Sequence, residues 1–458
     1  MVGITTFVTI ALGVLALAVR PGVALGILIV SMLIWPEFLR IPMGLAAMSA
    51  PRLIAIALLI RFIIQGRHVN MNVCSVDYMV FLIWLWTVIA TMLSGATSAK
   101  VNEMIGYGFD TVLMYFVARL AIRSMQDVAG MAWPLFGIAA WMCIVGWQEA
   151  ITTQSPYVGL DAYRTWVWIA KEPEFRLGMM RAKASTSVHI YFGMAMMLIA
   201  GIAWAMRSNP RVRKISTLTA AFAAVGGLAS MSSGPWLAIV TLIICNMYIL
   251  RPKMIKPTLY VMLGVAIFLE LASNRHFYHL IDYLALNSST AWYRTRLIEV
   301  AVAQWRDYWI VGANGIDINY WGGLLDGRRH IDLVNHFLIV AVNGGIPAFL
   351  MYVFSHVNAV RYAAQARKKS KDPFRRRLIF CLISTLIALD ISIMSVGLFE
   401  QPLILSNILL GLIVSAAKGW KEVPLRTAPP VAIEETEAPV QSKPGALPRP
   451  SEPGTARF

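Results

Sequence analysis

Residues 273–347 read SNRHFYHLIDYLALNSSTAWYRTRLIEVAVAQWRDYWIVGANGIDINYWGGLLDGRRHIDLVNHFLIVAVNGGIP. Most of this stretch is a long water-soluble segment between two hydrophobic spans, whereas most other connections between apolar runs are short. It is rich in Arg, Trp, Tyr and His, which bind anions and stack on rings. Loops held by a rigid scaffold often carry function, so we expect the chemistry of the chain in this segment.

The composition on both sides of that segment indicates an integral membrane protein. Of the 458 residues, 58% are hydrophobic and 14% are charged, and the mean hydropathy is +0.64. A soluble core of this size could not cover so much apolar surface. We expect an all-α polytopic protein with about 12–13 transmembrane helices, and the candidate spans lie near 3–19, 22–39, 46–64, 77–94, 106–122, 128–149, 187–206, 215–232, 235–250, 257–272, 335–356, 377–396 and 401–417.

The net charge of +16 is better explained by membrane topology than by a surface that binds nucleic acid. Lys and Arg concentrate in the connectors 207–214, 251–256 and 361–377, and connectors poor in Lys and Arg alternate with them. The positive-inside rule places these basic connectors and the C-terminus in the cytoplasm. Loops 150–186 and 273–334 then face outward. We expect a multi-pass protein of the bacterial inner membrane with its site facing the periplasm, and no nucleic-acid partner.

The domain organisation follows from these spans. The four cysteines are isolated in or beside apolar runs, which indicates inert buried thiols. The first apolar run has no basic n-region or cleavage site, so we expect it to be retained. The expected parts are N-terminal transmembrane helices (1–149), a first outer loop (150–186), central transmembrane helices (187–272), a large outer catalytic loop (273–334), C-terminal transmembrane helices (335–417) and a disordered cytoplasmic tail (418–458) rich in Pro, Glu, Ala and Ser.

Two arginines, Arg176 and Arg181, stand shortly before the span that begins near residue 187. A guanidinium binds phosphate through two parallel hydrogen bonds and keeps its charge at neutral pH. Arginines at this position therefore suit a lipid-linked phosphate or diphosphate. The simpler interpretation is that they extend to lipid headgroups at the membrane surface.

The large loop predicts an amphipathic helix over 290–306, lying along the membrane, because its apolar residues recur at helical spacing. Arg294 and Arg296 on this helix are further candidates for binding the diphosphate. Aromatic rings suit either a sugar-binding cleft or an interfacial belt. The candidates for contact with a sugar are Trp292, Tyr293, Trp305 and Asn335.

The large loop ends with His330, Asp332 and His336 within seven residues. Imidazole is suited to general acid or base catalysis near neutral pH, and a carboxylate can orient it. A single interfacial His is often only a hydrogen-bonded bystander. The outward-facing segments carry no HExxH or DxD-type arrangement, so we expect no metal and no cofactor.

Four segments in order resemble bacterial membrane proteins of the O-antigen ligase/polymerase superfamily, especially exopolysaccharide repeat-unit polymerase-like (Wzy-like) proteins. RAKASTSVHIYFG at 181–193 resembles R-A-x-G-x-F-x-H-P-I-x-F-G, and SMSSGP at 230–235 resembles an S-x-S-S-G-P turn. SSTAWYRTRLIE at 288–299 resembles S-G-T-x-Y-Y-R-x-x-x-x-E, and 332–345 resembles a polar segment at the head of a late span. Together the motifs cover roughly residues 180–350.

This resemblance implies an inverting, metal-independent glycosyltransferase acting outside the inner membrane on polyprenyl-diphosphate-linked glycans. Carried over by motif, Arg181 and Arg294 would hold the diphosphate, and a His near the late span would activate the acceptor hydroxyl. Val334 stands where ligases have that His. His336 lies two residues later and His330 one helical turn earlier, so both remain candidates for the base.

We therefore expect polymerisation of lipid-linked oligosaccharide repeats into exopolysaccharide, capsule or O-antigen. The expected partners are an undecaprenyl-diphosphate-linked oligosaccharide, the lipid bilayer, and flippase and chain-length or export proteins. One alternative is an O-antigen ligase that transfers the glycan to lipid A core or protein. Another is a non-enzymatic transporter, for which Arg61, Asp110, Asp390 and Glu400 are the few charges at depth.

Overall fold

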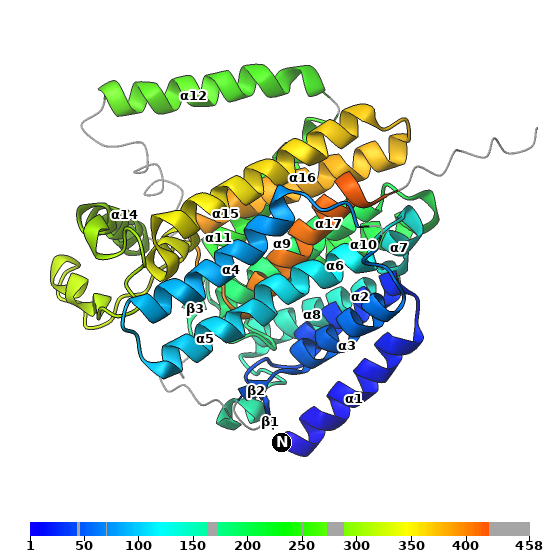
Figure 1. The fold of residues 1–458 in the computed structure, drawn as a ribbon, viewed down its shortest axis with the longest axis horizontal. Helices are drawn as coiled ribbons and strands as arrows, with labels where there is room; N and C mark the ends of the chain where they lie inside the picture. The colour runs from blue at the N-terminus through cyan, green and yellow to red at the C-terminus, as the bar shows by residue number, and fades with distance from the viewer. Residues whose placement is uncertain (44–45, 70, 164–172, 250, 273–287, 421–458) are drawn as a thin grey trace, which may run out of the picture. The chain divides into compact units, whose positions relative to one another are not determined.

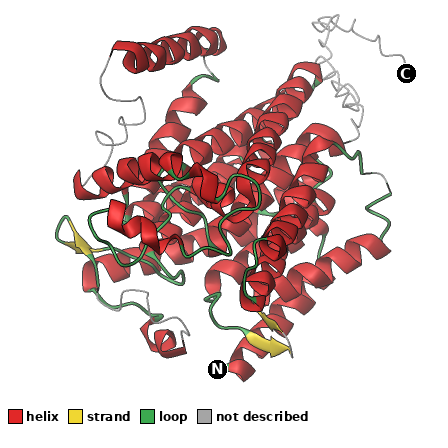
Figure 2. Ribbon diagram, turned by 60° about the vertical axis from the view of Figure 1, so that its left-hand side comes forward, coloured by secondary structure: helices red, strands yellow, loops and turns green. Residues whose placement is uncertain are grey.

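The computed structural model describes residues 1–43, 46–69, 71–163, 173–249, 251–272 and 288–420. Most of the predicted disordered tail (421–458) and the first part of the large loop lie outside these residues. The first tail residues, Lys418–Trp420, are ordered: a short helix extends to Gly419, and Trp420 packs against the core. Everything described belongs to one unit, Met1–Trp420. It is 75% helix and 2% strand, and its strands form two short hairpins (Figure 2). The predicted all-α class is confirmed.

The elements are labelled in Figure 1. The α-helices are α1 (Val2–Ala18), α2 (Pro21–Ile34), α3 (Ala50–Ile64), α4 (Ser75–Leu93), α5 (Ser98–Gly108), α6 (Met114–Ala121), α7 (Met125–Gly130), α8 (Ala132–Thr152), α9 (His189–Met206), α10 (Arg213–Leu228), α11 (Ser233–Met247), α12 (Ile255–Ala272), α14 (Ser288–Ala303), α15 (His336–Lys369), α16 (Pro373–Ile393) and α17 (Glu400–Val414). The strands are β1 (Ile41–Met43), β2 (Ala46–Met48), β3 (Phe175–Arg176) and β4 (Met179–Met180), and the short π and 3-10 helices are η1 (Phe109–Leu113), η2 (Val158–Tyr163), η3 (Pro210–Val212), η4 (Pro252–Met254), η6 (Trp305–Asp307), η7 (Ile318–Leu324) and η8 (Ser415–Gly419).

Every predicted span coincides with helix, although the boundaries differ. Helix α2 ends at Ile34, not near residue 39, because a residue before proline disfavours helical geometry and Trp35 precedes Pro36. Four further apolar helices are shorter than a full span. Within the described residues, five helical stretches are long and apolar enough to cross a membrane, namely Ser75–Leu93, Met125–Thr152, His189–Met206, His336–Lys369 and Glu400–Gly419. The total of 12–13 spans stays a prediction.

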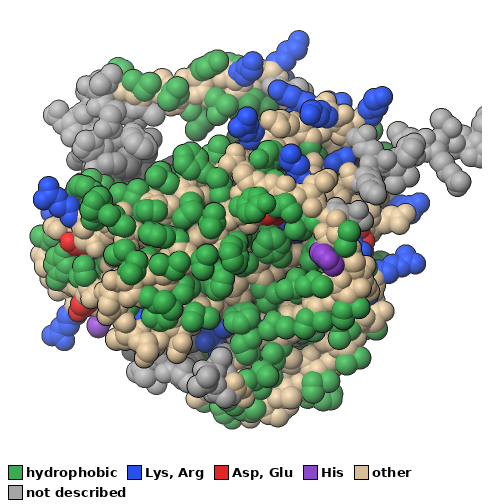
Figure 3. Space-filling view, viewed as in Figure 1, with side chains coloured by type: hydrophobic (Ala, Val, Ile, Leu, Met, Phe, Trp, Pro, Cys, Tyr) green, Lys and Arg blue, Asp and Glu red, His purple; other side chains and the backbone are tan. Residues whose placement is uncertain are grey.

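Helix α9 forms the centre of the bundle, in contact with α8, α10, α11, α16 and α17 (Figure 1). Most of its residues are buried. Small residues allow this close approach: a side chain at Gly201 would overlap the side chain of Thr385 on α16. Around this core, apolar side chains cover the middle of the face in Figure 3, while many Lys and Arg lie toward the upper right. That distribution is typical of a lipid-facing surface.

A bend in α15 makes room for the large loop. Gly345 has φ of 73°, and a Cβ atom there would collide with the carbonyl oxygen of Ile310. Only glycine accepts this geometry without strain. The loop backbone then bonds to the bend, because Ile346 donates to the Trp309 carbonyl at 3.0 Å and Ala313 to the Val342 carbonyl at 2.7 Å. The loop is thereby fixed to a transmembrane helix.

The segments that precede α9, α11, α15 and α17 meet at one end of the bundle, called the loop end below. Ala182 donates to the Ala229 carbonyl at 3.0 Å. The Ser187 hydroxyl bonds to Glu400 at 2.5 Å, and the Leu398 amide bonds to His336 Nδ1 at 3.3 Å. Segments far apart in sequence are therefore joined at the loop end by hydrogen bonds.

A buried ion pair joins α4 to α6. Arg119 Nε lies 2.9 Å from Asp77 Oδ1, and both side chains are almost inaccessible. The Tyr115 hydroxyl and the Cys74 amide each donate to the same carboxylate at 2.7 Å. The carboxylate is thus satisfied on both oxygens, as a buried charge requires.

We expect Asp77→Ala to destabilise the protein by about 3–5 kcal/mol, because it leaves the Arg119 charge buried without its partner. Unfolding of the detergent-solubilised protein by SDS, followed by circular dichroism, measures this loss. Glu103→Ala is the control, since Glu103 pairs with Lys100 in the open, where an ion pair contributes at most about 1 kcal/mol. Equal losses in the two variants would contradict the prediction.

Candidate functional site

Three arginines from two distant segments come together at the loop end. Arg176 and Arg181 lie on and just after the β3–β4 hairpin, and Arg294 lies on α14. Burial lowers the pKa of Arg181, and the positive charges of Arg176 and Arg294 lower it further. Burial and the positive charge of Arg176 also lower the pKa of Arg294. We call these three residues the arginine cluster.

Arg294 is the least satisfied member of the arginine cluster. Its side chain is 7% exposed, and its Nε has no hydrogen-bond partner. Its guanidinium also forms no ion pair with any residue that the structure describes. A buried charge without a partner is costly in the folded state. The cluster therefore has unused capacity to bind an anion.

Local contacts hold the two hairpin arginines in place. Arg176 Nη1 donates to the Met231 carbonyl at 2.9 Å, and Arg181 Nη2 donates to Ser232 Oγ at 3.1 Å. Both acceptors belong to the turn before α11, where Met231 has a left-handed φ of 47°. Arg181 Nη1 also bonds to Glu174 at 2.5 Å. Because Glu174 is half exposed, it can turn away when another anion binds.

A buried glutamate shapes the segment that carries Arg181. Glu149 at the end of α8 is fully buried and accepts from the Lys183 amide at 3.2 Å and from the Ala184 amide at 2.7 Å. Ala184 has φ of 47°, which is unfavourable for a residue with a side chain. The contacts with Glu149 compensate for this strain and fix the path of the segment.

Asp332 borders the arginine cluster from the large loop. Crowding by protein atoms raises its pKa, while the charges of Arg294 and Arg328 lower it. The residue is nevertheless exposed to solvent, so we treat it as a carboxylate at neutral pH. The Tyr293 hydroxyl donates to the Asp332 carbonyl at 2.9 Å and accepts from its amide at 3.0 Å. Arg328 covers the Tyr293 ring at 4.2 Å.

Three carboxyl groups form a second group at this end: Glu37, Asp110 and Glu400, called the carboxylate cluster. Arg52 donates to both oxygens of Asp110, at 2.8 and 2.5 Å. Glu37 Oε1 lies 3.9 Å from Arg52 and Oε2 has no hydrogen-bond partner among the described residues. Burial, followed by the charges of Asp110 and Glu400, raises the pKa of Glu37 to about 8. Glu37 is therefore mostly protonated at neutral pH.

The arginine and carboxylate clusters adjoin through α9. Glu400 accepts a hydrogen bond from Ser187, two residues before α9 begins. Tyr191 on the first turn of α9 lies within electrostatic range of both Glu400 and Asp332. Asp332 in turn interacts with Arg294. Tyr191 is therefore close to members of both groups.

The other predicted site residues are spread more widely. His336 is buried; its ring packs edge-on against Tyr352 at 5.5 Å, and its Nε2 has no partner among the described residues. His330 is exposed, and neither histidine contacts Asp332 in the part of the chain described. Arg296 is exposed and pairs with Glu299 at 2.7 Å.

The candidate sugar-binding residues also separate. The rings of Trp292 and Trp305 are about two-fifths exposed, whereas Tyr293 is buried. The Asn335 side chain accepts from the Leu338 amide and so caps α15. The helix predicted over 290–306 is observed as α14. Within the described residues, no three His, Cys, Asp or Glu side chains are arranged to hold a metal ion.

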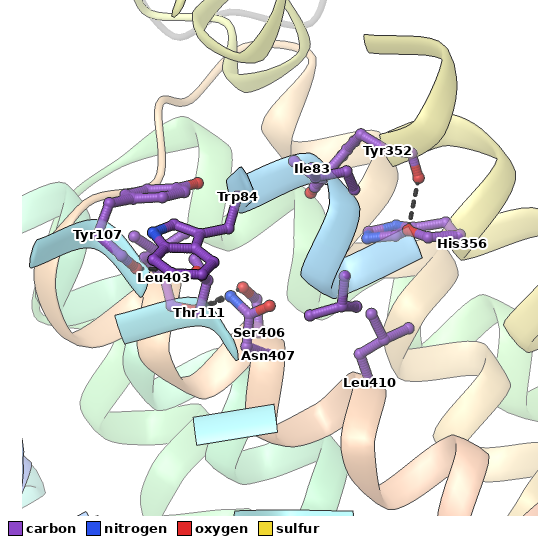
Figure 4. Close-up of a pocket in the computed structure, with 12 residues that line it drawn as sticks. Ile83, Trp84, Tyr107, Thr111, Tyr352, His356, Leu403, Ser406, Asn407 and Leu410 are labelled. Atoms are coloured by element: carbon purple, nitrogen blue, oxygen red, sulfur yellow. Dashed lines mark hydrogen bonds between the residues drawn. The ribbon is translucent and has the colours of Figure 1, made fainter. Parts of the chain in front are cut away.

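A small cavity with a mostly apolar lining lies deeper in the bundle, between α4, α5, η1, α15 and α17 (Figure 4). The centre of a water molecule can occupy about 30 Å³ of this cavity. That is room for about two waters and not for a sugar. His356 on its wall bonds through Nδ1 to Asp390 at 2.7 Å. Asp390, one of the charges at depth named in the sequence analysis, is thus hydrogen-bonded to His356.

Sequence reasoning missed Glu37 as a site residue, because it falls inside the apolar window predicted as the second span. The signal that could have identified it is the Trp35-Pro36-Glu37 sequence, in which a helix-ending proline precedes an acid. Glu400 was recognised only as a charge at depth. No protein-family model and no curated protein matches this sequence.

The raised pKa of Glu37 predicts a pH-dependent stability. An acid whose folded pKa lies above its unfolded value stabilises the fold fully below the unfolded pKa, and loses that effect as pH rises through the folded pKa. For Glu37 the window runs from 4.5 to about 8, with a slope of about 1.4 kcal/mol per pH unit. Thermal unfolding of wild type and Glu37→Gln from pH 5 to 8.5 should show wild type losing stability relative to the variant. Parallel curves would contradict the assignment.

Proposed function

We propose that the protein is a metal-independent glycosyltransferase that polymerises polyprenyl-diphosphate-linked oligosaccharide repeats outside a bacterial inner membrane. The observation that carries this proposal is the buried guanidinium of Arg294 beside Arg176 and Arg181, with an Nε that has no hydrogen-bond partner among the described residues. Two or three guanidinium groups match a diphosphate in charge and hydrogen-bond geometry. The membrane-spanning helices next to them suit the lipid that carries such a diphosphate.

The arginine cluster would serve the reaction by stabilising the leaving group. When the bond between the anomeric carbon and the diphosphate breaks, negative charge grows on the polyprenyl diphosphate. Fixed guanidinium groups stabilise that charge more in the transition state than in the ground state, which accelerates the reaction without a metal. The order of motifs that resembles repeat-unit polymerases favours a second repeat as acceptor over lipid A core or protein.

The exposed rings of Trp292 and Trp305 on and after α14 support the sugar part of the proposal. Sugar rings pack their C–H faces on aromatic side chains. Trp292 lies on the helix that carries Arg294, and Trp305 follows the end of that helix. A glycan held on these rings would therefore be near a diphosphate held by the arginine cluster.

We expect Arg294→Ala to lower polymerisation by at least about 100-fold, because one transition-state hydrogen-bond donor contributes about that much. The assay uses purified protein with an undecaprenyl-diphosphate-linked repeat in EDTA, and products are separated by size. Arg296→Ala is the matched control: it removes the same side chain two residues away, where Arg296 is exposed and paired with Glu299. It should retain activity within a few-fold.

Equal loss in the two variants would contradict the assignment of Arg294. If wild type makes no multimers, transfer to a lipid A core or protein acceptor is tested next. In cells, Arg181→Ala should leave single lipid-linked repeats on the outer face of the membrane. Their accumulation on the cytoplasmic face would instead support transport.

A further inference from the structure

We propose that Glu400 is the general base that removes the proton from the acceptor hydroxyl, an inference that rests on the proposed glycosyl transfer. Its carboxylate borders the same part of the loop end as the arginine cluster. It is partly accessible, as a group that must meet substrate needs to be. Neither the residue pattern nor the resemblance to polymerases assigned it this role.

The position of Glu400 is fixed from two sides. Ser187 donates a hydrogen bond to its Oε1 at 2.5 Å. The preceding residue, Phe399, packs its ring 6.1 Å from that of Tyr191. Tyr191 lies within electrostatic range of both Glu400 and Asp332, and Asp332 interacts with Arg294. Ser187 lies six residues after Arg181 in the segment that leads into α9, so an acceptor bound beside Tyr191 would be near both the carboxylate and the arginine cluster.

The backbone at Glu400 is strained. It is the first residue of α17 and has φ of 50°, which residues with side chains rarely adopt. Such strain persists where the surroundings determine the conformation, and it concentrates at functional sites. Six non-glycine residues have a left-handed φ in the described chain, and four of them lie in the segments that build the two clusters: Leu177, Ala184, Met231 and Glu400.

The other two members of the carboxylate cluster have different surroundings. Asp110 is neutralised by the two hydrogen bonds from Arg52. Glu37, buried in the loop between α2 and β1, holds its proton at neutral pH. A protonated Glu37 therefore adds no negative charge beside Glu400. A carboxylate that is ionised can accept a proton, which is the first requirement of a base.

The reaction balances as follows. The acceptor hydroxyl oxygen forms a bond to the anomeric carbon of the donor, and its proton passes to the Glu400 carboxylate. The bond from the anomeric carbon to the diphosphate oxygen breaks, and its electron pair leaves with the polyprenyl diphosphate held by the arginine cluster. Protonated Glu400 then returns its proton to water. No metal, oxidant or reductant takes part.

The test compares Glu400→Gln with wild type in the purified assay, across pH 5–9. The variant should lose about 10²–10⁴-fold in rate, the typical contribution of a general base. The fall of the wild-type rate at low pH, where the base is protonated, should be absent from the variant. Glu299→Gln is the matched control, since it makes the same change at a carboxylate paired with exposed Arg296, and it should leave rate and pH profile unchanged.

Azide separates a base from a merely structural residue, because azide attacks carbon without losing a proton. With azide, Glu400→Gln should release glycosyl azide at a rate that approaches the wild-type rate, while Arg294→Ala should not, since its leaving group is unassisted. A slow variant that azide does not rescue would overturn the proposal. The proposal would also be overturned if azide restored the rate of Asp332→Asn but not that of Glu400→Gln, because Asp332 would then be the base.

Glu400→Asp is the second variant if Glu400→Gln does not fold. This substitution keeps the negative charge but shortens the side chain by one methylene group, so the rate should fall at least about tenfold. The rate of the variant should still decrease at low pH, as in wild type. An unchanged rate would contradict the proposal. Failure of wild type to form any glycosidic bond from the diphosphate donor would instead reject the proposed function, which distinguishes the two failures.

Discussion

A charge removed from water must be matched by an opposite charge or by hydrogen bonds, and this constraint governs the interior of the bundle. Asp77 pairs with Arg119, Asp110 with Arg52 and Asp390 with His356. Arg61 donates to the carbonyl oxygens of Ala16 and Val19. Each of these contacts joins elements far apart in sequence, so the same bonds that satisfy the charges also fix the packing of the helices.

The arginine cluster departs from this rule. Burial and the positive charge of Arg176 lower the pKa of both Arg181 and Arg294, and the Nε atoms of Arg181 and Arg294 have no partner among the described residues. Asp77 and Asp110, by contrast, each have an arginine partner among the described residues. An anion bound here would relieve both the repulsion and the unmet hydrogen-bond capacity.

The sequence predicted the helices well because membrane spans depend on local hydropathy, which is readable residue by residue. It also identified Arg176, Arg181 and Arg294, since arginines beside apolar spans are unusual enough to notice. That Arg181 and Arg294 act together was expected only through the resemblance to polymerases, which does not include Arg176. Glu37 was hidden because a hydropathy window averages one acid with many apolar neighbours.

Other features of the site depend on long-range contacts and could not be read from local patterns. The β3–β4 hairpin is only two residues per strand, too short for an alternating pattern. The left-handed backbone at Glu400 arises from its surroundings, since nothing about glutamate favours it. The expected pairing of a histidine with Asp332 was reasonable from spacing, yet His336 begins α15 with its ring turned toward Tyr352.

The separation of the two clusters has a consequence for the order of events. Under the proposed function, an anionic donor would be drawn to the positive charges of the arginine cluster. A neutral sugar hydroxyl has no such preference and would be free to approach the carboxylates. The arginine cluster would therefore position the donor, and the acceptor would be aligned separately.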